Sequence, residues 1–340
     1  MGMRNTDYKP PFPWFGGKSP VAEMVWPRLG DVANYVEPFA GSAAMLFLRP
    51  GEPGTETIND ADGFVANFWR AIQRDSDAVA HHADWPVNEC DMHARHLWLL
   101  GERERITDRL AGDPDFYDSR AAGWWVWGLC CWIGSGWCSG NGPWVSENGM
   151  MVLRNSGQGV NRQLPHLGNS GQGVNRKRPH LGDPGKGECF QRSEWLRGYL
   201  AWFADRLRRV RVCCGDWKRV CGPCVTFRRG VTGVFLDPPY ADTAKRTKDL
   251  YATDCESVAH EVREWAIEQG ANRAMRICLC GYDGEHDMPP DWSVVDWEAS
   301  GGYGLISDDE DATGRVNRTR ERLWFSPGCL KVDEQKELWG

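Results

Sequence analysis

Two consecutive prolines after a short apolar run constrain the fold of this chain more than any other feature. The run Val234-Phe235-Leu236 has the composition of a buried strand, and Asp237-Pro238-Pro239-Tyr240 follows it directly. Proline cannot donate a hydrogen bond to a sheet and restricts the residue before it, so the chain must leave the sheet here. Because ligands of open α/β sheets bind beyond the carboxyl ends of strands, we expect residues 237–240 to form a functional site rather than a buried turn.

The groups of this tetrapeptide also indicate what it binds. The carboxylate of Asp237, the carbonyl of Pro238 and the ring of Tyr240 are expected to converge on one small volume. Two hydrogen-bond acceptors beside an aromatic plane suit a planar ligand group that carries an NH2. The predicted catalytic residues are therefore Asp237, Pro238, Pro239 and Tyr240.

A second candidate site is a turn of small residues. A predicted strand at residues 35–37 ends in the turn, and a predicted helix at residues 43–48 follows it; the turn itself is Pro38, Phe39, Ala40, Gly41 and Ser42. Small residues let a ligand approach the backbone, and the helix start offers free N–H groups. Neither GxGxxG nor GxxxxGKS/T is present, so a nucleotide phosphate is not the expected ligand. Asp60 follows the next predicted strand, residues 56–59, where an acid can bind ribose hydroxyls.

Helices and strands alternate on both sides of a long central stretch. One predicted helix begins after Ser19, which is expected to be its N-cap. Further helices are predicted at residues 64–72, 195–207 and 257–270, and Gly270 is expected to be the C-terminal cap of the last of these. Predicted strands cover residues 210–213, 233–236, 276–280, 292–297 and 322–326. This pattern predicts an α/β sheet formed by residues 1–75 and 196–340, with an inserted module at 76–195.

The inserted module has a composition of its own. Its second apolar stretch holds Trp124, Trp125, Trp127, Trp132 and Trp137. Stacking on nucleic-acid bases is one interpretation, but packing in a helical core is favoured because large aromatic side chains mostly serve burial.

Residues 155–168 recur at 169–182, and twelve of the fourteen positions are identical. Each copy of this tandem duplication offers a Gln, two Asn and an Arg, which can contact base edges or phosphates. Expansion of a surface loop by replication slippage is the equally weighted alternative.

The charge of the chain is distributed unevenly. The net charge is −7, but residues 151–230 hold 16 Lys and Arg against 5 Asp and Glu. This segment is either a surface that faces phosphates or a solvated basic face without a ligand. The candidate contacts to phosphates or bases in this segment are Arg154, Asn161, Arg162, Asn175, Arg176, Lys177 and Arg178. The later cluster Arg315, Arg318, Arg320 and Arg322 either contacts phosphates or balances nearby acids.

The thirteen cysteines lack the spacing of a disulfide framework and indicate reduced thiols, typical of the cytoplasm. Cys221 and Cys224 have the spacing of half a zinc site, but no second pair completes it, so we expect no metal. The histidines are assigned to a helix surface rather than to a metal cluster: His81, His82, His93 and His96. No apolar run is long enough to predict a membrane span.

Four motifs in a fixed order carry a resemblance to a known family. They are Trp14-Phe15-Gly16-Gly17-Lys18, the sequence EPFAGS at 37–42, Asn59-Asp60, and DPPY at 237–240. In this order the chain resembles the Dam-type (D12 class, α group) DNA N6-adenine methyltransferases over about residues 12–75 and 205–330. The resemblance implies a Rossmann-like methyltransferase sheet with an inserted target-recognition module. It also implies S-adenosylmethionine (SAM) as methyl donor, double-stranded DNA as partner, and a monomer.

The resemblance implies roles for individual residues. Trp14, Gly16, Gly17 and Lys18 match the segment that helps to hold the cofactor, and Glu37 to Ser42 match the cofactor loop. Asp60 matches the acid that binds ribose, and Asp216 matches the acid near the adenine ring. The chain departs from many relatives at Ala43, where they have a further Gly, and at Ala61-Asp62, where Ile-Asn is more usual; both departures bear on cofactor affinity.

The implied reaction follows from the chemistry of an aryl amine, whose lone pair is delocalised. The target adenine leaves the duplex stack and is held against Tyr240. If Asp237 and the Pro238 carbonyl each accept one N6 hydrogen, the nitrogen becomes pyramidal and its lone pair points at the methyl group. The sulfonium supplies a strong leaving group, because the neutral thioether departs when the S–CH3 bond breaks, so no metal is required. The alternatives are transfer to cytosine N4 or to an RNA adenine, and a non-catalytic DNA-binding protein of the same fold.

Overall fold

The computed structural model describes residues 10–12, 14, 17–132, 137–138, 144–147, 150–153, 189–240, 258–297 and 321–332, and it describes 144–147, 150–153 and 189–192 by their backbone only. The chain divides into two compact units. The helical unit comprises Met1–Phe15, Asp60–Arg208 and Thr247–Asp254. The sheet unit comprises Gly16–Asn59, Arg209–Arg246 and Cys255–Gly340.

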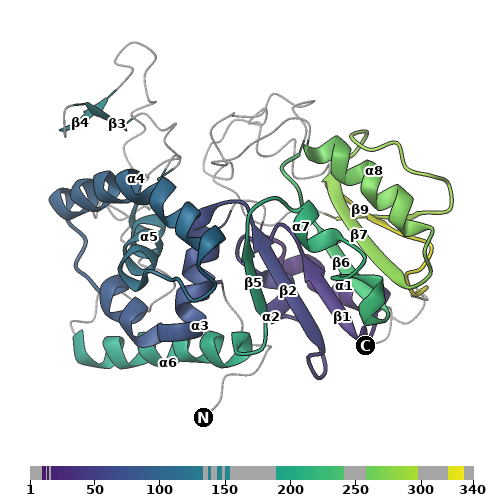
Figure 1. Cartoon of the computed structure of the whole chain (residues 1–340), viewed down its shortest axis with the longest axis horizontal. Helices are drawn as coiled ribbons and strands as arrows, with labels where there is room; N and C mark the ends of the chain where they lie inside the picture. The colour runs from purple at the N-terminus through teal and green to yellow at the C-terminus, as the bar shows by residue number, and fades with distance from the viewer. Residues whose placement is uncertain are drawn as a thin grey trace, which may run out of the picture. The chain divides into compact units, whose positions relative to one another are not determined.

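The sheet unit is built on a mixed sheet (Figure 1). In the described part of the chain seven strands form this sheet, in the order β5-β2-β1-β6-β7-β9-β8. They are β1 (Asn34–Glu37), β2 (Thr55–Asp60), β5 (Arg211–Cys214), β6 (Thr232–Leu236), β7 (Met275–Tyr282), β8 (Ser293–Asp296) and β9 (Glu321–Phe325). The strands β2, β1, β6 and β7 pair in parallel, whereas β9 is antiparallel to both β7 and β8. The predicted α/β class is confirmed, and the sheet is consistent with a methyltransferase fold.

The strand order brings two of the predicted motifs together. The chain proceeds from β1 to β2 on one side, and β6 lies on the other side of β1, with Val36 paired to Val234. The strand order therefore reverses between β1 and β6. Open α/β sheets bind ligands at such a switch point, beyond the carboxyl ends of the strands. The turn after β1 and the tetrapeptide after β6 flank this point.

Helices cover both faces of the sheet, as buried parallel strands require. One face packs against α7 (Lys218–Cys221) and α8 (Val258–Gly270) through alternate strand residues: Val36, Val234, Leu236, Ile277 and Leu279. The other face carries Tyr35, because successive strand side chains point to opposite sides. Tyr35 packs against Trp26 of α1 (Ala22–Leu29), with ring centroids 4.9 Å apart. The short helix α2 (Ala44–Phe47) follows the turn after β1.

The helical unit contains α3 (Gly63–Ala83), α4 (Glu89–Gly112), α5 (Ser119–Cys131), α6 (Cys189–Leu207) and a hairpin of β3 (Trp144–Glu147) and β4 (Met150–Leu153). Helix α3 packs against the other three helices. The aromatic core of the helical unit includes Phe12, Phe68 and Trp125. The ring centroid of Phe12 lies 5.3 Å from that of Phe68 and 5.1 Å from that of Trp125. Trp125, Trp127 and Trp137 are buried, so the predicted core packing is confirmed for these three.

Two predicted helix caps are wrong. Ser19 does not cap α1, because the amide of Val21 bonds to the carbonyl of Lys18 and a 3-10 turn, η2 (Ser19–Val21), precedes the helix. Gly270 ends α8 but does not have positive φ. A Cβ on Gly270 would lie 2.5 Å from the ring of Trp292, so this glycine permits close packing rather than a left-handed cap.

The expected boundaries of the inserted module, 75/76 and 195/196, fall within α3 and α6. A three-part functional division of the chain stays a prediction. The tandem repeats at 155–182 lie outside the described residues. None of the helices in the described part of the chain combines the length and apolarity that crossing a membrane requires.

Candidate active site

The carboxylate of Asp237 is the centre of the polar contacts at the end of β6. Lys18 Nζ lies 3.0 Å from Asp237 Oδ1, and the Tyr240 hydroxyl donates to the same oxygen at 3.0 Å. The Lys18 ammonium also lies 5.3 Å from the centre of the Tyr240 ring. Among the described residues, these contacts engage Oδ1 and leave Oδ2 available to accept a hydrogen bond from a ligand.

Two residues from the antiparallel edge of the sheet complete this cluster. Glu321 is the first residue of β9 and pairs with Tyr282, the last residue of β7, so it lies at the same sheet edge as Asp237. Glu321 Oε2 lies 3.7 Å from Lys18 Nζ, within ion-pair range but too far for a hydrogen bond. The ring of Trp297, directly after β8, lies 5.8 Å from the same ammonium. The sequence does not single out Glu321 and Trp297, because their place at this edge depends on the antiparallel pairing of β9 with β7 and β8, which local patterns do not predict.

The cluster is largely enclosed. Lys18, Tyr240 and Glu321 are 5%, 8% and 6% exposed, and the side chain of Asp237 is 22% exposed. Burial, followed by the charge of Asp237, raises the pKa of Tyr240 well above its ordinary value, so its hydroxyl stays protonated and donates. Burial also raises the pKa of Glu321, while the Lys18 ammonium opposes this shift.

The ring of Tyr240 is covered in this structure. It lies edge-to-face against Tyr282, with centroids 4.7 Å apart. A base can stack on Tyr240 only if some of the covering groups move.

The turn after β1 has a backbone conformation that suits small residues. Gly41 has φ 47° and Ala43 has φ 52°, both in the left-handed region that favours glycine. Asn59 at the end of β2 ties this turn to its neighbours, because its amide nitrogen donates to the carbonyls of Pro38 at 3.0 Å and Gly215 at 2.9 Å. One buried side chain thus links the segments that follow β1 and β5.

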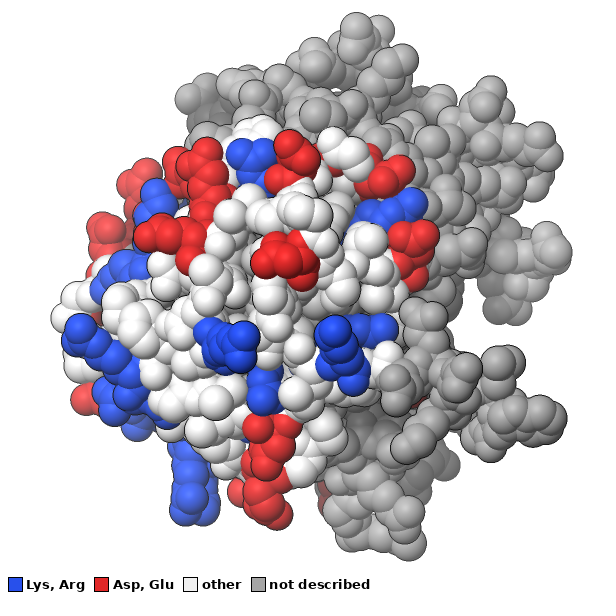
Figure 2. Space-filling model, turned by 90° about the vertical axis from the view of Figure 1, so that its right-hand side faces the viewer, with Lys and Arg blue, Asp and Glu red and all other residues white. Residues whose placement is uncertain are grey.

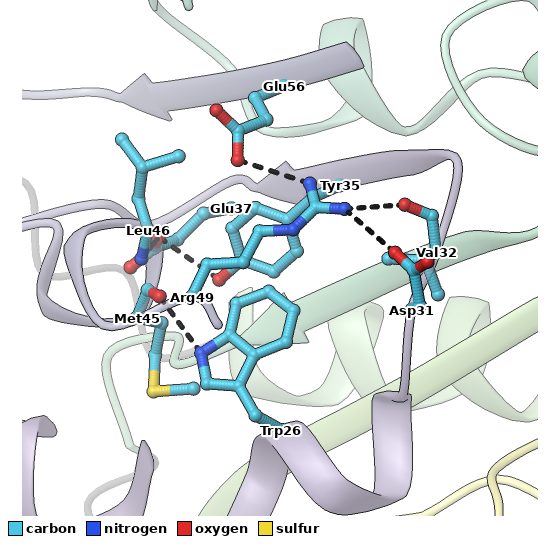
Figure 3. Close-up of polar contacts among 9 residues, drawn as sticks. All are labelled: Trp26, Asp31, Val32, Tyr35, Glu37, Met45, Leu46, Arg49 and Glu56. Carbon is cyan, nitrogen blue, oxygen red and sulfur yellow. Dashed lines mark hydrogen bonds and ion pairs between the residues drawn. The ribbon is translucent and has the colours of Figure 1, made fainter. Parts of the chain in front are cut away.

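Glu37 is the last residue of β1, directly before this turn, and its carboxyl group accepts hydrogen bonds from neutral donors (Figure 3). Its Oε2 accepts from the Tyr35 hydroxyl at 3.1 Å and from the Leu46 amide at 3.2 Å. Burial raises the pKa of Glu37 to about 8, although both hydrogen bonds act in the opposite direction. Glu37 is therefore a protonated, neutral group near pH 7. Its neighbour Arg49 instead pairs with the buried Glu56 at 3.1 Å.

Asp216 follows β5 at the same edge of the sheet and is exposed. Its Oδ1 accepts from the Lys218 amide at 2.9 Å, which fixes the start of α7. The neighbouring Trp217 is buried and lies 6.2 Å from the ring of Phe39, so the segments after β1 and β5 share an apolar contact.

The remaining predicted cofactor residues are placed in different parts of the molecule. Trp14 and Asp60 belong to the helical unit, where Trp14 lies 5.6 Å from Phe12 and Asp60 Oδ1 accepts from the Asp62 amide at 2.9 Å. Gly17 belongs to the sheet unit and is exposed, and Gly16 lies outside the described residues.

The predicted DNA contacts all lie outside the described residues; they are Arg154, Asn161, Arg162, Asn175, Arg176, Lys177 and Arg178. Figure 2 shows Lys and Arg interspersed with Asp and Glu over one face, so the described residues of that face form no continuous basic surface. Arg322, the described member of the late arginine cluster, pairs with Asp296 at 2.9 Å and Asp283 at 3.6 Å, which supports the charge-balancing interpretation for this residue.

The described residues contain no group of three or more His, Cys, Asp or Glu arranged to hold a metal. His96 is buried and its ring stacks on Trp132, with centroids 4.9 Å apart. The expected position of His96 on a helix surface is therefore wrong: burial lowers the pKa of His96 to about 4, and it is a neutral core residue.

The sheet order and the cluster at its switch point are consistent with a methyltransferase-type α/β fold. Residues 14–91 match the family model described as D12 class N6 adenine-specific DNA methyltransferase. The resemblance to this family is thereby confirmed over that segment, which includes the turn after β1 and Asp60, and it supports an adenine-specific DNA methyltransferase. The match does not extend to residues 237–240, and a comparison with curated proteins gives no match.

Proposed function

We propose that the chain transfers a methyl group from SAM to N6 of an adenine in double-stranded DNA. The observation that carries this proposal is the position of Asp237. Its carboxylate lies at the end of β6, beside the turn that follows β1, at the point where the strand order reverses. The match of residues 14–91 to an N6-adenine methyltransferase family supports the same reaction.

The proposed cofactor site lies at the same edge of the sheet as Asp237. SAM supplies, when bound, an electrophilic methyl group on a sulfonium. Residues 37–42, the turn after β1, would hold SAM through their backbone. Asp60 would bind its ribose, and Asp216 would lie near its adenine ring. The other proposed cofactor residues are Trp14, Gly16, Gly17 and Lys18. The cluster fits a cationic ligand, because Asp237 and Glu321 provide two carboxylates beside the single ammonium of Lys18.

The target base is proposed to swing out of the duplex, at a cost of about a few kcal/mol, since its amine is unreachable inside the stack. Asp237 Oδ2 and the Pro238 carbonyl then each accept one hydrogen of N6, and Pro239 fixes the course of the chain between Pro238 and Tyr240. The ring of Tyr240 would hold the base by stacking after the covering groups have moved.

Recognition of DNA is proposed for the inserted module at 76–195, with contacts from the basic and amide side chains in and beside the repeats. The chemistry needs a single chain, so we propose a monomer, acting on DNA in the cytoplasm.

Identification of the methylated nucleoside tests this function. Purified protein and SAM labelled in the methyl group are incubated with duplex DNA or with RNA, and the nucleosides are separated by mass spectrometry. We expect label in N6-methyladenine from DNA. Label in N4-methylcytosine or in RNA adenine would assign a different acceptor, and unlabelled nucleic acid of both kinds would support the non-catalytic alternative.

A further inference from the structure

The cluster around Lys18 holds more negative than positive charge. Asp237 is the closer carboxylate and shares Oδ1 with both Lys18 and the Tyr240 hydroxyl. Glu321 is the second carboxylate, and its buried Oε2 has no hydrogen-bond partner among the described residues. Counted over the described residues alone, one ammonium against two ionised carboxylates gives the cluster a formal charge of −1.

Glu37 does not add to this charge near neutral pH, because burial raises its pKa to about 8. Asp237 is neutralised at close range by Lys18, at 3.0 Å. The excess negative charge therefore depends on Glu321, which lies farther from the shared ammonium. In an enclosed site such a charge is only weakly screened and acts strongly on a bound ion.

The methyl donor and its product differ by one charge. The methionine part of SAM is a zwitterion and its sulfonium adds one positive charge, whereas transfer of the methyl group leaves a neutral thioether. A cluster with an excess of negative charge thus distinguishes the two ligands, although they share almost every other group.

We propose that Glu321 makes the site prefer the cationic sulfonium donor over its neutral thioether product, and so favours release of the product after transfer. This inference rests on the proposed function. Glu321 is a specificity-determining residue in this account, since it contacts Lys18 and need not touch the reacting atoms.

The test is the affinity of each ligand for the wild type and for Glu321→Gln, measured by calorimetry at about pH 7, where Glu37 is largely protonated. The probes are SAM and S-adenosylhomocysteine. Glutamine keeps the size of the side chain and removes its charge. We expect the preference for SAM over S-adenosylhomocysteine to fall about tenfold, equivalent to about 1.4 kcal/mol. Glu321→Asp, which restores the charge, should recover part of the preference.

Glu52→Gln is the matched control. Glu52 is exposed and precedes β2, at the opposite end of the strands from the site, so its charge should not affect the preference. Thermal unfolding of each variant shows whether it is folded at the temperature of the titration.

The outcomes separate this inference from the proposed function. A wild-type protein that binds neither ligand contradicts the proposed function itself. If the wild type binds both and Glu321→Gln weakens both equally, Glu321 has a structural role only and the inference is overturned. An unchanged preference in Glu321→Gln overturns it as well.

Discussion

Lys18 and Asp237 form an ion pair with Nζ 3.0 Å from Oδ1, which joins the loop before η2 to the carboxyl end of β6. The pair lies where the strand order of the sheet reverses, and Glu321 approaches the same ammonium from the antiparallel strand β9. One buried ammonium therefore connects three segments that are far apart in the sequence.

Replacement of Lys18 by Met should destabilise the sheet unit by about 3 kcal/mol, because it leaves the buried Glu321 and the partly buried Asp237 without their shared cation. Hydrogen exchange of the backbone amides in β6 and β9 measures this locally. The exposed Lys331→Met is the control and should have no effect. The additional change Glu321→Gln should recover part of the loss, and exchange rates in Lys18→Met equal to wild type would show that the pair does not stabilise the site.

Glu37 should make stability depend on pH. Its pKa is raised from 4.5 to about 8 in the folded chain, so the folded state binds more protons between these values and loses stability as pH rises through them. Glu37→Gln can still accept from Tyr35 and Leu46 but does not ionise.

Urea denaturation from about pH 5 to about pH 9 compares the two proteins. The variant should match the wild type at the acidic end and be more stable, by a few kcal/mol, at the alkaline end. Parallel stability curves would mean that Glu37 titrates alike in the folded and unfolded chains.

Ala43 should tolerate glycine better than its helical neighbour. Ala43 has φ 52° and ψ 32°, a left-handed conformation that costs an alanine about 1 kcal/mol and a glycine almost nothing. This gain offsets the loss of one buried methyl group, so Ala43→Gly should change stability by less than about 1 kcal/mol. Ala44→Gly, equally buried but at the start of α2, should cost about 2 kcal/mol because glycine also weakens a helix. Equal losses in thermal unfolding would contradict the argument.

Deletion of residues 169–182 should weaken DNA binding if the repeats contact phosphates. The deleted copy carries three positive charges, Arg176, Lys177 and Arg178. Loss of three phosphate contacts lowers the slope of log affinity against log salt by up to about 3. Fluorescence anisotropy at several salt concentrations measures the slope, and an unchanged slope and site preference would leave replication slippage as the explanation of the duplication.

Much of the sheet unit could be predicted from the sequence because its strands are short, apolar and followed by turn residues. Val234-Phe235-Leu236 became the end of β6, and the proline pair after it marks the carboxyl edge of the sheet. Gly41 and Ala43 explain the preference for small residues in the turn after β1, since both have positive φ.

Glu321 and Asn59 could not be assigned in this way. Glu321 reaches the site because β9 runs antiparallel, so the start of that strand, not its end, lies at the ligand edge. Asn59 belongs to a predicted motif, but its two hydrogen bonds to backbone carbonyls depend on the meeting of β2 with the loops that follow β1 and β5. Such contacts follow from strand order, which local periodicity does not determine.

The most direct test of the account is the single-turnover rate of methyl transfer to DNA by Asp237→Asn, compared with wild type and with the exposed Asp291→Asn. We predict a loss of about a hundredfold or more in Asp237→Asn, because the site loses a charged acceptor for the target amine. DNA binding should stay near wild type, and Asp291→Asn should transfer normally. A wild-type rate in Asp237→Asn would contradict the central claim that this carboxylate holds the reacting amine.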